Sequence, residues 1–106
     1  MYIGHIRDAI TRIEVCTAVG RERFIAEWLY HEAAIRQLEI IGEATKRLSP
    51  ELRRRHTEID WHRVAGLRDV LIHNYMGVDL DRVWVITQET VPELKRTVET
   101  LLNQER

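Results

Sequence analysis

The densest group of chemically active side chains in this sequence lies between residues 68 and 75. Arg68, Asp69, His73 and Tyr75 supply a guanidinium, a carboxylate, an imidazole and a phenol there. Asp69 and His73 are four residues apart, so on one helix the carboxylate can meet the imidazole, orient it and favour its protonated form. The segment therefore combines a group that titrates near neutral pH with a permanent positive charge.

The spacing of these residues restricts how they can form one site. Arg68 and His73 are five residues apart and diverge by about 140° around an ideal helix, whereas Arg68 and Tyr75 share one face. A site that uses both Arg68 and His73 needs a distortion near His73, or the same helix from a second subunit. In the alternative, purely structural interpretation, Arg68 pairs with glutamates of a neighbouring helix. His73 is then a partly buried polar residue, and Tyr75 packs against Trp84.

A second candidate site is a cluster of cations in the middle of the chain. It concentrates positive charge over two helical turns and a cap, which is enough to bind a few phosphates. Cations also favour the C-terminus of a helix, so a solvated helix end is the alternative explanation. The members of this basic cluster are Lys46, Arg47, Arg53, Arg54 and Arg55.

The cysteine and the other histidines indicate no further site. Cys16 is expected to be buried and inert, as most lone cysteines are. His31 and Glu32 lack the second histidine of a zinc-protease helix, and His56 and His62 have neither helical nor zinc-finger spacing. We expect these histidines at the surface, and we predict no metal and no cofactor.

The composition favours one ordinary globular domain, residues 1–106. The chain is 44% hydrophobic and 31% charged, and its net charge of −1 produces no strong global field, so nucleic acid must be bound by a local patch. The longest strictly apolar run, residues 83–86, is too short to span a membrane, and the N-terminus does not resemble a signal peptide. A single cysteine excludes an internal disulfide framework and is typical of the cytoplasm.

Apolar residues recur at helical spacing through almost the whole chain. A first helix is expected to end near Gly20, and a second to run from about Trp28 to Leu48. Ser49 and Pro50 are the residue types of an N-cap and a first helical position, so a short basic helix follows them. The residues expected to face the core are Ile3, Ile6, Ile10, Ile13 and Thr17 in the first helix and Ala34, Leu38, Ile41, Thr45 and Leu48 in the second.

A third main helix is predicted from about Trp61 to Asn74, with Asp60 as its N-cap. Gly77 ends it, and Asp79 caps the last segment, where a proline within a Thr-Val-Pro-Glu capping box predicts a kink or a restart. The sequence therefore predicts an all-α protein, an up-and-down four-helix bundle with an extra short helix. The residues expected to face the core are Val64, Leu67 and Leu71 in the third helix and Trp84, Thr87, Val91, Leu94, Val98 and Leu101 in the last segment.

The string Arg68-x4-His73-x-Tyr75 resembles the signature of HEPN-domain ribonucleases. More narrowly, the chain resembles HepT-like toxins, which are encoded beside a minimal nucleotidyltransferase antitoxin. A bare R-x4-H pattern has little specificity, but here the flanking sequence matches as well, over nearly the whole chain. The flanking stretches that resemble the family include residues 1–3, 35–44, 61–66, 77–80 and 91–94.

This resemblance implies a HEPN-like fold and metal-independent cleavage of RNA in a cleft between two subunits. In that chemistry His73 accepts the proton of a ribose 2′-hydroxyl, and Arg68 binds the negative charge that accumulates on the phosphorane. Asp69 would hold His73 in orientation. A homodimer is therefore expected, with Val70 and Ile72, which lie off the core stripe, near its interface.

The resemblance also implies a partner and a means of regulation. Tyr75 resembles the tyrosine that the antitoxin adenylylates, and phosphate attached there would compete with RNA for the arginine. The implied function is the toxin of a type VII toxin–antitoxin system. The alternative is a non-catalytic helical docking partner of a minimal nucleotidyltransferase. Growth arrest caused by this chain alone would favour the toxin.

Overall fold

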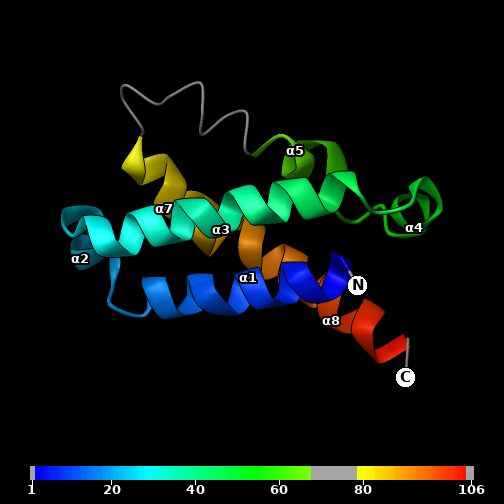
Figure 1. Cartoon of the computed structure of the whole chain (residues 1–106), viewed down its shortest axis with the longest axis horizontal. Coiled ribbons are helices and arrows are strands. Elements are labelled where there is room, and N and C mark those ends of the chain that lie inside the picture. The colour runs from blue at the N-terminus through cyan, green and yellow to red at the C-terminus, as the bar shows by residue number, and fades with distance from the viewer. Residues whose placement is uncertain (1, 68–78, 105–106) are drawn as a thin grey trace.

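The computed structural model describes residues 2–67 and 79–104, and every regular element within these ranges is an α-helix (Figure 1). The all-α class predicted from the periodicity is confirmed. No helix in the described ranges is long and apolar enough to cross a membrane. The helices are α1 Tyr2–Thr17, α2 Arg21–Ala26, α3 Trp28–Lys46, α4 Pro50–Arg55, α5 Trp61–Ala65, α7 Leu80–Gln88 and α8 Thr90–Gln104.

The long helices α1 and α3 lie side by side and antiparallel (Figure 1). α1 ends at Thr17, three residues before the predicted end at Gly20, and α3 ends at Lys46, two residues before Leu48. Between them the chain turns through α2. Gly20 at the start of α2 has a φ of 91°, a backbone conformation that glycine adopts without a steric cost.

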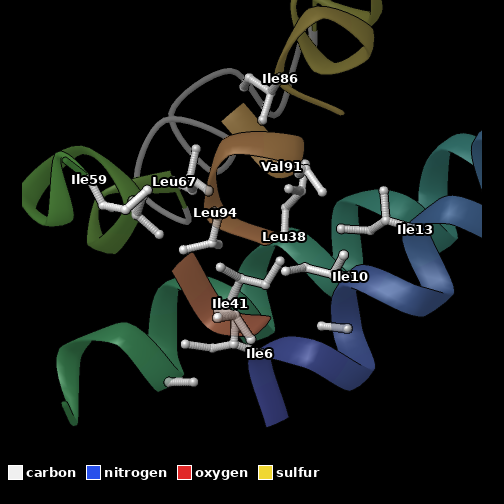
Figure 2. Packing of buried hydrophobic residues seen from close by; sticks show 14 of the residues in the cluster. Ile6, Ile10, Ile13, Leu38, Ile41, Ile59, Leu67, Ile86, Val91 and Leu94 are labelled. Atoms are coloured by element: carbon white, nitrogen blue, oxygen red, sulfur yellow. The ribbon is translucent and has the colours of Figure 1, made fainter. Parts of the chain in front are cut away.

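The core lies where α1, α3 and α8 meet, and it consists mainly of branched aliphatic side chains (Figure 2). Leu38 and Ile41 of α3 are fully buried and face the isoleucines of α1. Thr45 continues this stripe, and its hydroxyl donates to the carbonyl oxygen of Ile41 at 2.7 Å, so its burial leaves no unpaired polar group. Among the described residues that were predicted to face the core, all are buried except the half-buried Thr17 and Trp84.

Three predicted N-caps are confirmed by their hydrogen bonds. The Ser49 hydroxyl, the Asp60 carboxylate and the Asp79 carboxylate each accept from a backbone N–H three residues further on, at 3.1 Å. These bonds satisfy N–H groups at the start of α4, α5 and α7 that have no partner within the helix. The sequence therefore located the start of each of these helices.

The helix predicted from about Trp61 to Asn74 is interrupted at Gly66. α5 ends at Ala65, and Gly66 follows with φ −84° and ψ 0°, its N–H bonded to the carbonyls of the last turn. Glycine is among the poorest helix formers, so a break there costs little, and Leu67 is helical again. Residues 68–74 of that prediction lie outside the described residues.

The predicted restart in the last segment is confirmed at the first residue of the predicted capping box, Thr90. α7 ends at Gln88, Glu89 interrupts the helix, and α8 begins at Thr90. Pro92 is tolerated in the first turn of α8, because an N–H there has no partner within the helix. α7 packs on α2 and α3, whereas α8 packs on α1, so the last helix of the predicted bundle is divided in two.

Candidate functional site

The predicted catalytic residues Arg68, Asp69 and His73 lie outside the described residues, and so does Tyr75. The structure describes the two positions that flank them. Leu67 is 4% exposed and joins the core, and Asp79 caps α7. The segment that contains the motif is therefore attached to the fold at both ends.

On the upstream side, α5 is anchored against α3. Trp61 and Val64 are buried, which is the three-residue spacing of one helical face. The indole Nε1 of Trp61 donates to the carbonyl oxygen of His56 at 2.8 Å, so the buried ring keeps its hydrogen bond. A rigid turn thus leads into the motif.

On the downstream side, α7 is anchored against α2. The Trp84 ring lies 5.2 Å from the ring of Phe24, centroid to centroid, and Asp81 forms an ion pair with Arg21. Val83 and Ile86 are buried beneath. The helix that follows the motif is therefore fixed by both apolar and charged contacts.

The members of the predicted basic cluster differ in their contacts. The Arg53 guanidinium turns inward, and its Nη2 donates to the carbonyl oxygen of Leu48 at 3.1 Å, beyond the end of α3. Arg53 therefore caps the C-terminal end of α3, which agrees with the alternative explanation of the cluster as cations at a helix end. Arg54 and Arg55 of the same short helix are exposed, and no ion pair holds them within the described residues.

The other two members of the cluster are the last residue of α3, Lys46, and its C-cap, Arg47. Lys46 is exposed, with its Nζ 3.8 Å from Oε1 of Glu43 one turn earlier. The Arg47 guanidinium lies over the ring of Tyr2, 5.9 Å from the ring centroid. Phosphate binding by this cluster therefore remains a prediction, and Arg53 is the member with an evident structural role.

Two histidines are less exposed than predicted. His31 is half-buried, and its Nδ1 lies 2.9 Å from the carbonyl oxygen of Phe24 in a hydrogen bond across the turn between α2 and α3. The His56 side chain is 14% exposed, with Nδ1 3.4 Å from Oε2 of Glu58. The expectation of surface histidines is wrong for both, because contacts with other elements cover them.

Sequence reasoning missed a polar contact between the α4–α5 connection and α8. Glu58 Oε2 accepts from the Thr97 hydroxyl at 3.1 Å, although the two residues are 39 positions apart. The pKa of Glu58 is lowered, first by a hydrogen bond from its own backbone N–H and then by Thr97 and His56. No local pattern could reveal this contact, because only folding brings the two segments together.

Cys16 is buried, as predicted, and this burial raises the pKa of its thiol. A raised pKa keeps the group as a thiol and therefore a poor nucleophile. Within residues 2–67 and 79–104, no group of three or more histidine, cysteine or acidic side chains could hold a metal ion.

Comparison with known families decides the affiliation of the chain. The sequence model of the family described as "Ribonuclease HepT-like" matches residues 6–101. The chain belongs to this HepT-like ribonuclease family. The resemblance noted from the motif and its flanks is thereby confirmed.

Individual HepT-like relatives are similar over nearly the full chain. The "Probable ribonuclease HepT" of Thermococcus cleftensis is 42% identical over 94% of this chain and 92% of its own. The "Putative RNase TTE0752" of Caldanaerobacter subterraneus subsp. tengcongensis is 37% identical, with 99% and 95% covered. No solved structure matches.

A third HepT-like relative is a larger protein. The "Gamma-glutamylcyclotransferase and putative RNase MJ0434" of Methanocaldococcus jannaschii is 36% identical over 98% of this chain. The match covers 47% of that protein. The HepT-like domain thus also occurs as one part of a longer chain.

Proposed function

We propose that this protein is a metal-independent endoribonuclease and acts as the cytoplasmic toxin of a type VII toxin–antitoxin system. The observation that carries the proposal is the sequence Arg68-x4-His73-x-Tyr75 inside the region that matches the HepT-like family. Relatives that bear ribonuclease names and match nearly the full length of this chain support it.

The proposed reaction is attack by a ribose 2′-hydroxyl on the adjacent phosphorus. His73 accepts the hydroxyl proton as the new O–P bond forms, which suits an imidazole near neutral pH. Arg68 stabilises the negative charge on the phosphorane, and Asp69 orients His73. The P–O5′ bond then breaks and the leaving oxygen takes up a proton, giving a 2′,3′-cyclic phosphate and a 5′-hydroxyl.

In this proposal two copies of the chain form one active cleft. Arg68 and His73 diverge on a regular helix, and pairing across a homodimer brings the two groups to one phosphate. Sedimentation should therefore give a dimer at micromolar concentration. A monomer at that concentration would contradict the two-subunit site.

The decisive experiment measures cleavage of RNA by the purified protein. His73→Ala and Arg68→Ala should each lower the rate at least about 100-fold. His62→Ala is the matched control, because His62 is exposed on α5, and it should retain full rate. Cleavage should persist in EDTA and leave a 2′,3′-cyclic end.

Loss of cleavage in EDTA, or full activity of either motif variant, would exclude this mechanism. Expression in cells separates it from the non-catalytic docking protein. The wild-type chain should arrest growth, and His73→Ala should not. A docking protein would arrest growth in neither form.

Tyr75 is the proposed site of control by a minimal nucleotidyltransferase. A free tyrosine phenol has a pKa of about 10, too high for an efficient base at pH 7, so a regulatory role suits this residue type better than catalysis. Each AMP unit would add a phosphodiester that competes with RNA for Arg68 or for the basic cluster.

This assignment is tested with Tyr75→Phe. The variant should keep its toxicity and escape the antitoxin, and its intact mass should not change after incubation with the nucleotidyltransferase, ATP and magnesium. The wild-type chain should gain whole AMP units. Unchanged addition of AMP to Tyr75→Phe would show that another residue is the acceptor.

A further inference from the structure

A groove of about 400 Å³ lies between the start of α1 and the second half of α3. It is at the end of the molecule where the N-terminus and α4 lie (Figure 1). Its volume is within the range of small-molecule sites. Among the described residues, the lining of the groove includes Arg47 of the basic cluster.

Planar side chains line the α1 side of the groove. The rings of Tyr2 and His5 meet edge to face, with centroids 5.9 Å apart and an angle of 89° between planes. The Arg47 guanidinium lies 5.9 Å from the Tyr2 centroid. Aromatic rings and arginine planes are the surfaces on which proteins stack unpaired nucleobases.

Charged side chains of α3 and its C-cap line the other side. Arg36 and the C-cap Arg47 are both exposed and stand eleven residues apart, about 16 Å along the helix, with Glu39 and Glu43 between them. Arg36 Nη1 is 3.9 Å from Oε2 of the half-buried Glu39, a long ion pair that exchanges readily for another partner. The groove therefore offers two cations to phosphates and a carboxylate acceptor to the same ligand.

We propose that this groove is a subsite for one unpaired nucleotide of the RNA substrate. The base stacks on the planar groups of Tyr2, His5 and Arg47, and the sugar–phosphate chain runs between Arg36 and Arg47. Glu39 accepts a hydrogen bond from an exocyclic amino group of the base, as carboxylates do with cytosine. The groove therefore favours adenine, cytosine or guanine over uracil.

This inference rests on the proposed function only in naming RNA as the ligand. A duplex keeps its bases stacked and paired, so the planar surfaces select a single strand. The exposed Arg54 and Arg55 lie on α4 at the same end of the molecule and add two further cations there (Figure 1).

The test measures binding of a fluorescent oligo(A) that carries a 2′-O-methyl group on every ribose, which prevents cleavage by 2′-hydroxyl attack. Tyr2→Ala and Arg47→Gln should each weaken binding about 10-fold, the typical loss of one stacked base. Tyr2→Phe keeps the ring and should bind like the wild-type protein. Arg96→Gln removes an equally exposed arginine on α8 and should change affinity less than about 2-fold.

Base preference gives a second readout that does not depend on net charge. The wild-type protein should bind oligo(A) more tightly than oligo(U), and Glu39→Met should lower that ratio toward one. The proposal would be overturned if Arg47→Gln and Arg96→Gln lost the same affinity for oligo(A), or if Tyr2→Ala lost none. Arg47 is exposed, so its variant remains informative even if Tyr2→Ala unfolds.

Cleavage of unmodified RNA, measured in parallel, separates this inference from the proposed function. If the wild-type protein cleaves RNA and all groove variants bind normally, the subsite is excluded and the ribonuclease proposal stands. If the groove variants weaken binding but no form of the protein cleaves RNA, the ribonuclease proposal is excluded. The groove then remains as a binding site for single strands.

Discussion

The α1–α3 pair and the short helix α4 are held in place by different forces. α1 buries six of its residues, whereas α4 buries none. α4 is fixed by directional bonds: the Ser49 hydroxyl caps its start, and Arg53 donates to the carbonyl oxygen of Leu48. Burial stabilises one region without regard to direction, and a few hydrogen bonds set the shape of the other. The second arrangement leaves cations free to meet an anionic ligand.

The largest effect on stability is expected in the first region. Leu38→Ala removes a fully buried side chain and should lower the free energy of unfolding by about 2–5 kcal/mol. Leu29→Ala is the matched control on the same helix, because Leu29 is 61% exposed, and its effect should stay within about 0.5 kcal/mol. Urea unfolding measures both. Similar losses for the two variants would contradict the described packing.

A smaller loss is expected at the cap of α4. Ser49→Ala should lower the free energy of unfolding by about 1 kcal/mol, because the Leu52 N–H loses its acceptor. Ser49→Gly should lower the free energy of unfolding by only a few tenths of a kcal/mol. Hydrogen exchange should accelerate at the Leu52 amide and not in α1. Unchanged exchange there would show that the cap does not stabilise this end.

The Glu58 contact should make the stability of the same end depend on pH. The pKa of Glu58 is lowered in the folded protein, so the carboxylate stabilises the fold above its unfolded pKa of about 4.3. That contribution is lost as the pH falls through the folded pKa. Glu58→Gln should thus lower Tm slightly at pH 7 and leave it unchanged at low pH. A Tm difference independent of pH would show that the charge is not involved.

The smallest effect on stability is expected for the exposed cations. The double variant Arg54→Gln, Arg55→Gln should unfold within about 0.5 kcal/mol of the wild-type protein, because both side chains are exposed. Its affinity for single-stranded RNA should depend less on salt, with the log–log slope reduced by about 0.7 for each lost phosphate contact. Arg53→Gln should show the reverse, lower stability with the salt slope unchanged. An unchanged slope for the double variant would show that Arg54 and Arg55 of α4 do not contact RNA phosphates.

The sequence by itself determined the helical class, the start of most helices and the residues of the core. These features depend on local chemistry: a helix repeats every 3.6 residues, and Ser49, Asp60 and Asp79 cap through bonds to residues three positions away. The motif was also readable from sequence, because Arg68, His73 and Tyr75 lie within eight consecutive positions. Family membership followed from the same residues and their flanks.

Tertiary structure alone decided which polar side chains meet. Arg53 is adjacent to Arg54 and Arg55 in sequence, but only Arg53 turns inward, because a carbonyl left free after α3 lies within its reach. Glu58 meets Thr97 across 39 positions, and Tyr2 meets Arg47 across the α1–α3 pair. Such contacts depend on how helices pack, and packing is set by the shape of the whole core, which no local spacing encodes.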